Sequence, residues 1–238
     1  MSCCSFCKSK NVEILVEFGH MALAGGFLKQ ESFSSEKKYP MTLIYCNDCY
    51  MVQILEKIDP IEMFNDYFYF SSAIGTLSKH FNQYANEISK KFKLSEKSKV
   101  LEFGCNDGVL LKPLSEVGIG TVIGVDPALN VINTIDSKNI VLFPGFFDEQ
   151  MSEVVKNEHG KLDVIMANNV YAHIVDINST TAKPQFGDEY ELRLCGYNNW
   201  DACFEVSMVV TSTTTANDIL HGLKNKLNSS TASVVYQE

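Results

Sequence analysis

One segment of the chain, residues 99–126, restricts the possible folds more than any other. Residues 100–103 form a short, mostly apolar run that predicts a buried strand, and the GCNDG sequence of residues 104–108 predicts a tight turn. We expect a helix over residues 109–117 and a second strand over residues 121–126. A strand, a glycine turn, a helix and a second strand in this order are typical of parallel α/β folds that bind nucleotides.

The residues of the turn distinguish two kinds of nucleotide site. Dinucleotide-binding turns have the pattern GxGxxG, in which a close pair of glycines admits a pyrophosphate. Residues 102–108 read EFGCNDG and lack that pair, whereas S-adenosylmethionine (SAM) carries no phosphate and needs no such cradle. Asp126 ends the second strand, where such folds place the acid that holds a ribose diol. The pattern ExGCxxG resembles the first motif of class I SAM-dependent methyltransferases. A glycine turn in an unrelated α/β domain is the alternative.

Further elements of the same core are expected on both sides of this segment. Apolar residues at helical spacing predict helices over residues 78–93 and 128–135, and short apolar runs predict strands over residues 141–143 and 162–167. Side chains that follow parallel strands point into the ligand crevice. Aromatic residues after the third strand could flank the adenine, and polar residues after the fourth could face the reacting groups. The candidates in these positions are Phe146, Phe147, Asn168, Asn169 and His173.

Composition excludes several classes of partner. The net charge of −9 and the lack of a basic stripe disfavour nucleic acid, because phosphate contacts need a basic face. No apolar run approaches the roughly 20 residues of a membrane span, and the N-terminus lacks the charged and apolar regions of a secretory signal. We therefore expect a cytoplasmic protein that binds neither nucleic acid nor membrane. In that reducing compartment, eight cysteines are not expected to form a disulfide framework.

Four of the cysteines form two CxxC pairs, Cys4 with Cys7 and Cys46 with Cys49. Each pair can direct two thiolates at one ion, and two such turns give a closed tetrahedral site that suits structural zinc. The span between the pairs is longer than in usual zinc ribbons, so we expect a small inserted hairpin. The alternatives are two unrelated pairs, either buried as small hydrophobic residues or redox-active, and a site in which Cys3 replaces Cys4.

Taken together, the motifs resemble the zinc-containing sugar C-methyltransferases, a family that methylates a ring carbon of a nucleotide-linked keto-deoxysugar. The resemblance covers about residues 1–176. Besides the two cysteine pairs, the matching segments are FGHMALAGGFL at residues 18–28 (LGxxPLAxxFL in the family), YP at 39–40, MVQ at 51–53, DYFYFSS at 66–72 (DYxYxSS in the family), LEFGCNDG at 101–108, GVDP at 124–127 and ANNVYAHI at 167–174.

The resemblance implies a set of site residues. Tyr67, Tyr69 and Ser71 would border the SAM and sugar pocket, and His173 would lie near the sugar. In such enzymes a base removes a proton next to a ketone and the enolate attacks the SAM methyl group, so His173 and Tyr67 are the catalytic candidates. His173 could instead cap a helix, or hydrogen-bond to a site residue without direct contact to the sugar. The tyrosines could form an aromatic cluster at a domain junction. The residues expected to bind SAM are Tyr69, Ser71, Glu102, Gly104, Cys105, Asn106, Gly108, Asp126, Pro127, Phe146, Phe147 and Asn168.

The resemblance ends near Asp176. Family members continue for well over a hundred residues and carry a Tyr-x-Glu-His segment with a catalytic histidine, which this chain lacks. Its tail instead predicts strands over residues 190–195 and 203–210, a helix over 216–226 and a strand over 232–236, an order that resembles a ubiquitin-like β-grasp module. The same strands could complete the methyltransferase sheet in divergent form. A truncated or chimeric gene product is a third possibility.

We therefore expect an α/β chain in three parts: a zinc-binding module over residues 1–60, a Rossmann-like class I methyltransferase core over 61–177, and a divergent or separate α+β tail over 178–238. One hypothesis is a SAM-dependent C-methyltransferase that acts on a nucleotide-linked keto-deoxysugar. The other is a catalytically incomplete protein that keeps the zinc and SAM sites and recruits a protein partner through its tail.

Overall fold

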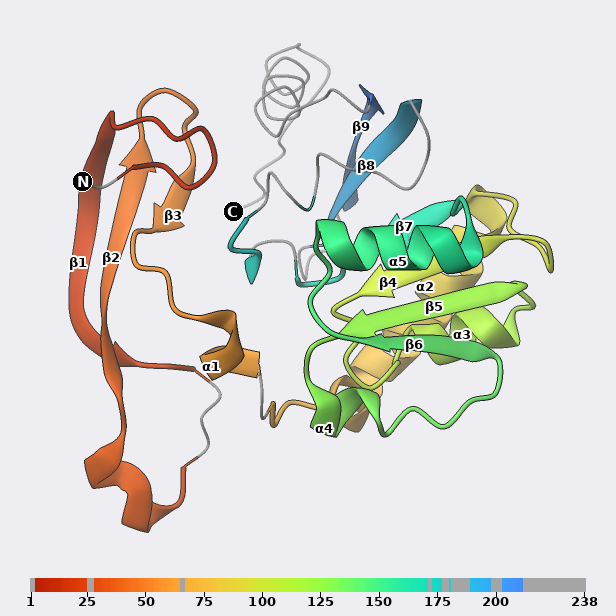
Figure 1. The fold of residues 1–238 in the computed structure, drawn as a ribbon, viewed down its shortest axis with the longest axis horizontal. Helices are drawn as coiled ribbons and strands as arrows, with labels where there is room; N and C mark the ends of the chain where they lie inside the picture. The colour runs from red at the N-terminus through yellow and green to blue at the C-terminus, as the bar shows by residue number, and fades with distance from the viewer. Residues whose placement is uncertain are drawn as a thin grey trace, which may run out of the picture.

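The computed structural model describes residues 3–24, 28–64, 67–170, 173–176, 180, 189–197 and 203–211. Its N-terminal part is a three-stranded antiparallel sheet of order β1-β2-β3 (Figure 1). The strands are β1 (Val12–Ala22), β2 (Lys38–Cys46) and β3 (Val52–Ile54), and the 3₁₀ helix η1 (Gln30–Ser35) lies between the first two. The hairpin expected between the cysteine pairs is therefore present, as a long two-stranded ribbon.

The core of this ribbon lies at its cysteine end. Cys4, Phe6, Cys46 and Cys49 are buried there, and Val12 and Met51 pack against them. Along the rest of β1, by contrast, most side chains face solvent, including five large apolar ones: Ile14, Leu15, Val16, Phe18 and Met21. Since a stable sheet needs a covered apolar face, the ribbon owes its order largely to the cysteine end.

A short connection leads from this sheet to the second one. The helix α1 (Pro60–Phe64) follows β3, and the 3₁₀ helix η2 (Ser71–Ala73) precedes the long helix α2 (Gly75–Lys91). The apolar residues Phe81, Ala85 and Ile88 form one buried stripe of α2, at the spacing from which a helix was predicted.

The second sheet is parallel and has the order β6-β5-β4-β7 (Figure 1). Its strands are β4 (Lys99–Phe103), β5 (Thr121–Asp126), β6 (Ile140–Pro144) and β7 (Val164–Met166). The chain steps outward from β4 through β5 to β6 and then returns to place β7 on the other side of β4. Such a reversal of strand order opens a crevice at the carboxyl ends of the strands, where ligands bind in α/β folds.

Helices cover both faces of this sheet, because the pleat sends alternate residues to opposite sides. Val100 and Val122 pack with α2 and α3 (Leu111–Glu116), whereas Leu101 and Ile123 pack with α5 (Glu149–His159). Figure 1 shows α5 in front of the strands and α2 and α3 behind them. The Rossmann-like fold expected for this part of the chain is confirmed by this arrangement.

Several element boundaries differ from the sequence prediction. The helix α4 is only Leu129–Ile132, and the Thr134 hydroxyl donates to the Val131 carbonyl 2.7 Å away, a side-chain bond that competes with helix continuation. The fourth strand, β7, is shorter than residues 162–167. The helix α5 was not predicted, although Asp148 caps it by accepting a hydrogen bond from the Met151 N–H at 2.9 Å.

The tail contributes β8 (Glu189–Tyr197) and β9 (Cys203–Thr211), which confirm the two strands expected there. They pair with each other as an antiparallel two-stranded sheet and, within the described part of the chain, with no strand of the parallel sheet. The predicted helix over residues 216–226 and the strand over 232–236 lie outside the described residues. No helix in the described ranges combines the length and the apolar character needed to cross a bilayer.

Candidate cofactor site and metal centre

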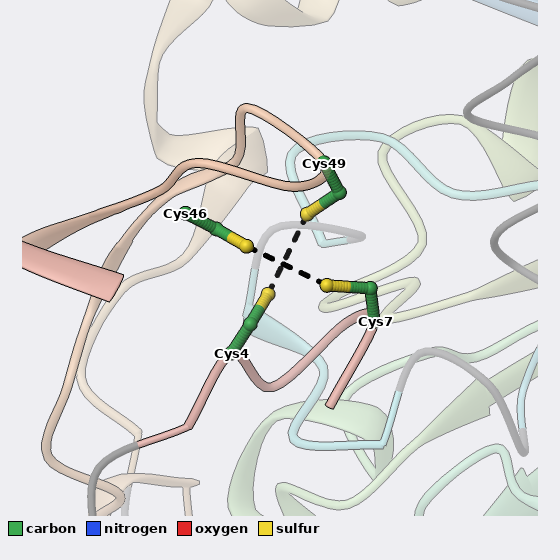
Figure 2. Close-up of side chains that lie close together, drawn as sticks. All are labelled: Cys4, Cys7, Cys46 and Cys49. Atoms are coloured by element: carbon green, nitrogen blue, oxygen red, sulfur yellow. Dashed lines mark hydrogen bonds between the residues drawn. The ribbon is translucent and has the colours of Figure 1, made fainter. Parts of the chain in front are cut away.

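The two CxxC pairs come together at the cysteine end of the ribbon (Figure 2). The sulfur of Cys4 lies 3.6 Å from that of Cys49, and the sulfur of Cys7 lies 3.5 Å from that of Cys46. All four ligand atoms lie within 4.8 Å of one another. These distances exclude disulfides, whose sulfurs are about 2.05 Å apart. They are close to the roughly 3.8 Å that a tetrahedral ion with bonds of about 2.3 Å imposes on its sulfurs.

Hydrogen bonds around the cysteine cluster affect the pKa of its thiols. The Gln53 side-chain amide donates to the Cys4 sulfur at 3.0 Å, while its oxygen accepts from the Ser5 N–H at 2.8 Å. Burial raises the pKa of the Cys4 thiol, but donation from the Cys7 N–H and from Gln53 outweighs it and lowers that pKa to about 7. Burial raises the pKa of Cys49. The donor set and its geometry thus fit zinc.

Cys3 is exposed and lies outside the cluster, so the ambiguity between Cys3 and Cys4 is resolved in favour of Cys4. The other expected arrangement, two unrelated pairs, does not match the described geometry. That the four cysteines are the ligands of a metal ion stays a prediction.

The glycine turn follows β4 at the carboxyl edge of the parallel sheet. Three of its residues have positive φ: Gly104 (66°), Asn106 (51°) and Gly108 (74°). A side chain on Gly104 would also collide with Val170, since an added Cβ would lie 2.2 Å from the Val170 Cγ2 atom. The conformation of the turn therefore requires glycine at residue 104 both for its backbone angle and for the close approach of the segment after β7.

Glu102 is buried near the end of β4, with only 3% of its surface exposed. Its Oε1 atom accepts a hydrogen bond from the Asn168 amide at 2.8 Å, while its Oε2 atom has no hydrogen-bond partner in the described part of the chain. Burial, together with the nearby charge of Asp126, raises the pKa of Glu102 to about 8 in spite of the Asn168 bond. A buried carboxylate oxygen that lacks a hydrogen-bond partner is suited to a cationic donor such as the ammonium group of SAM.

Asp126 ends β5 beside the turn. Its two oxygens accept main-chain hydrogen bonds from Asn106 at 2.8 Å and Ala128 at 2.9 Å. Burial raises its pKa, and these two bonds oppose the rise. Each carboxylate oxygen can accept a further bond, so Asp126 can hold ribose hydroxyls as expected.

The other predicted site residues lie along the same edge, with different degrees of access. The Cys105 thiol is buried in the core close to Gly124, and burial raises its pKa, so its main chain is the part that faces the turn. The Phe147 ring stacks on Phe103 with centroids 4.8 Å apart, whereas Phe146 is 40% exposed and Pro127 is half-buried. His173 is exposed, and its N–H donates to the Val170 carbonyl at 2.8 Å.

The tyrosine segment before α2 joins this edge through its main chain. The Ser71 N–H donates to the Asn106 side-chain oxygen at 2.9 Å, and the Asn106 amide donates to the Tyr69 carbonyl at 2.9 Å. Tyr67 is half-buried, and burial, Tyr69 and Asp126 all raise its pKa. The sequence-predicted residues from β4, β5, β6, β7 and this segment are therefore gathered at one edge of the sheet.

Three residues at this edge were not selected from the sequence: Asp107, Asn130 and Val170. Asp107 accepts hydrogen bonds from the Ser72 N–H at 3.1 Å and from the Ser72 hydroxyl at 2.5 Å. Its place inside the turn was a signal that could have identified it. Val170 lies in the matching segment 167–174, but nothing in that segment indicated its contact with Gly104. Asn130 gave no signal, because its partner Tyr67 is distant in sequence.

A cavity of about 520 Å³ lies at the opposite, amino-terminal edge of the sheet, where Glu96, Thr121 and Lys138 are among its lining residues. None of the predicted cofactor residues lines it. Its position before the strands, rather than after them, places it away from the crevice.

Comparison with known proteins agrees with both parts. Residues 4–64 match the family model described as "Putative zinc binding domain", and residues 77–182 match the one described as "Methyltransferase domain". C-methyltransferase NovU of Streptomyces niveus is 27% identical over 176 residues, which are 74% of this chain and 42% of NovU. The ubiquinone biosynthesis O-methyltransferase of Bartonella tribocorum is 32% identical over 91 residues, which are 36% of each chain.

A solved structure of a SAM-dependent methyltransferase from Anabaena variabilis covers 50% of this chain and 62% of its own, with 16% identity and a TM-score of 0.35. The chain spans less than half of the length of NovU and of the ubiquinone enzyme. The zinc-binding domain, the methyltransferase domain and their order were all predicted from the sequence. The chain thus contains a segment that matches a zinc-binding domain, followed by a segment that matches a methyltransferase domain.

Proposed function

We propose that the chain binds SAM at the carboxyl edge of β4 and β5 and takes part in methyl transfer to a carbon atom of a nucleotide-linked keto-deoxysugar. The main support for SAM binding comes from Glu102, because its Oε2 atom is buried with no hydrogen-bond partner among the described residues. Leaving such an atom unpaired is unfavourable, and a bound ammonium group would supply both a donor and a positive charge.

The sugar is what the resemblance of the sequence motifs implies, and the choice of carbon as methyl acceptor is supported by NovU. That relative is called a C-methyltransferase, and its alignment covers 74% of this chain. The ubiquinone O-methyltransferase aligns with only 36%. Carbon is therefore the methyl acceptor that the longer match favours.

Each candidate residue has a role in this proposal. Glu102 would hold the ammonium group of SAM and Asp126 its ribose, and bound SAM supplies an electrophilic methyl group. His173 would remove the proton next to the ketone, a task that suits imidazole because its pKa lies near neutrality. Tyr67, with its raised pKa, keeps its proton and can donate a hydrogen bond to the sugar oxygen.

A second function has an observation of its own. Within the described residues, β8 and β9 of the tail pair with each other and not with the parallel sheet, whose edge strand β7 has three residues. The alternative is a protein that binds zinc and SAM without catalysing methyl transfer. It would then act as a binding protein with a protein partner, the role expected of the tail.

Two measurements test these proposals in sequence. Titration calorimetry with SAM should give binding for the full chain and weaker binding for Glu102→Gln, with the exposed Glu116→Gln as the matched control. Absence of binding to the unaltered chain would overturn the SAM proposal. Methyl-labelled SAM and a nucleotide-linked keto-deoxysugar should then give a product whose NMR spectrum shows a methyl group on carbon. A methyl ether would contradict C-methylation, and binding without transfer would favour the second function.

A further inference from the structure

Residues 67–72, called here the strap, run across the carboxyl edge of the sheet before α2 begins. Figure 1 shows the chain between α1 and α2 passing close to α4 at this edge. Hydrogen bonds to three polar side chains attach the strap. Asn106 and Asp107 in the glycine turn bind its second half at Tyr69, Ser71 and Ser72. The third side chain, Asn130 in α4, binds its beginning.

Asn130 holds Tyr67 at two points. Its side-chain nitrogen donates to the Tyr67 carbonyl at 2.8 Å, and its side-chain oxygen accepts from the Tyr67 N–H at 3.3 Å. An amide that binds both polar groups of one residue fixes the orientation of that residue's main chain, and therefore the direction in which its side chain leaves. The two residues are 63 positions apart, so no local structure duplicates this restraint.

The surroundings of the Tyr67 ring make its direction matter. The ring lies between Phe64, at 5.7 Å between centroids, and Tyr69, at 6.3 Å. Asp126, the expected ribose ligand, is near enough to raise the pKa of the Tyr67 hydroxyl. The aromatic face of the strap thus borders the part of the crevice where Asp126 would hold the cofactor.

We propose that Asn130 is a positioning residue for SAM binding, which acts by holding Tyr67 and the strap against the crevice. This inference rests on the proposed function, because it assumes that SAM binds beside Asp126. The Asn130 side chain contacts the strap through its two hydrogen bonds to Tyr67. Its loss therefore acts on affinity through Tyr67, and the global stability of the chain changes little because Asn130 lies at the surface.

The direct test compares SAM affinity in Asn130→Ala and Asn133→Ala. Asn133 is exposed and three residues further along, and no side-chain hydrogen bond of it occurs in the described structure. We expect the dissociation constant to rise about fivefold in Asn130→Ala, as for two exposed neutral hydrogen bonds, and to stay unchanged in Asn133→Ala. Thermal unfolding of both variants should coincide with that of the unaltered chain.

A double-mutant cycle separates positioning from general support. If Asn130 acts through the Tyr67 side chain, Asn130→Ala should weaken SAM binding much less in a Tyr67→Phe or Tyr67→Ala background than alone. Additive losses would overturn the proposal, as would equal affinity of Asn130→Ala and the unaltered chain. Failure of the unaltered chain to bind SAM would instead overturn the proposed function, and this inference with it.

Hydrogen exchange of the chain without SAM gives an independent readout. Peptides that contain the strap should exchange faster in Asn130→Ala than in Asn133→Ala, while peptides from β4 and β5 exchange equally. Equal exchange of the strap in both variants would show that Asn130 does not hold it, and would overturn the proposal regardless of the binding result.

Discussion

Glu102→Gln should make the protein more stable at high pH and leave it nearly unchanged at low pH. The pKa of Glu102 is raised to about 8 by burial and by Asp126, against an ordinary value of 4.5. A carboxyl group whose pKa is raised on folding stabilises the folded state below pH 4.5, and this contribution is lost as the pH rises through 8. At about 1.4 kcal/mol per pKa unit, the ionised form would destabilise the fold by several kcal/mol, on the order of 5, at pH 9. Glutamine keeps the acceptor for Asn168 and cannot ionise.

The measurement is urea unfolding of both proteins without SAM, at pH 6 and pH 9. The unaltered chain should lose stability between these values, and Glu102→Gln should lose about 2.7 kcal/mol less, because about two of the roughly 3.5 pKa units between 4.5 and 8 lie above pH 6. Titrating groups far from Glu102 contribute equally to the two proteins, so the difference between their pH profiles reports on Glu102 and on its coupling to Asp126 and Cys105. Parallel profiles would refute the reasoning, because they would mean that the carboxyl group is solvated or paired in solution.

Three further expectations follow from the two sites. Metal analysis should find about one zinc per chain, lost in Cys46→Ser and retained in Cys3→Ser; zinc loss in both would contradict the assigned cluster. Gly104→Ala should lower stability by about 2–5 kcal/mol through both backbone strain and collision, and Gly118→Ala, which has positive φ but open space, by about 1 kcal/mol. Equal losses in urea unfolding would show that the collision is relieved. SAM binding at pH 7 should release most of a proton as Glu102 ionises, which calorimetry in two buffers of different ionisation enthalpy detects. Unchanged heat between the buffers would argue against the ammonium contact.

Local pattern was sufficient to predict the centre of the fold. The strand predicted over residues 100–103 is β4 with one residue added, and the strand predicted over 121–126 is β5. Both are buried on two faces, so they appear in the sequence as continuous apolar runs beside glycine. The CxxC spacing likewise identified the four sulfurs that the structure brings together, because each pair is made by one local turn.

Contacts between distant residues could not be predicted in this way. Asn130 and Tyr67 meet only because α4 and the strap share an edge of the sheet, and neither residue's neighbours carry a pattern that reports this. The unpaired state of the Glu102 oxygen could not be predicted for the same reason. Glutamate near the end of a strand was expected at the cofactor, but its burial depends on how the helices close over the sheet.

The position of the cysteine cluster has a consequence for the pairing register of the ribbon. Residues 23–37 join β1 to β2, so the tight turn that sets register in most hairpins is missing, and the pairing shifts twice, between Ile14 and Val16 and between Glu17 and Gly19. Cys46 pairs with Val12 at the opposite end. A bound ion would therefore lock the alignment of the strands from their open end. Without it, a slip by one residue would turn every side chain of β1, the long edge strand of this sheet, to the other face.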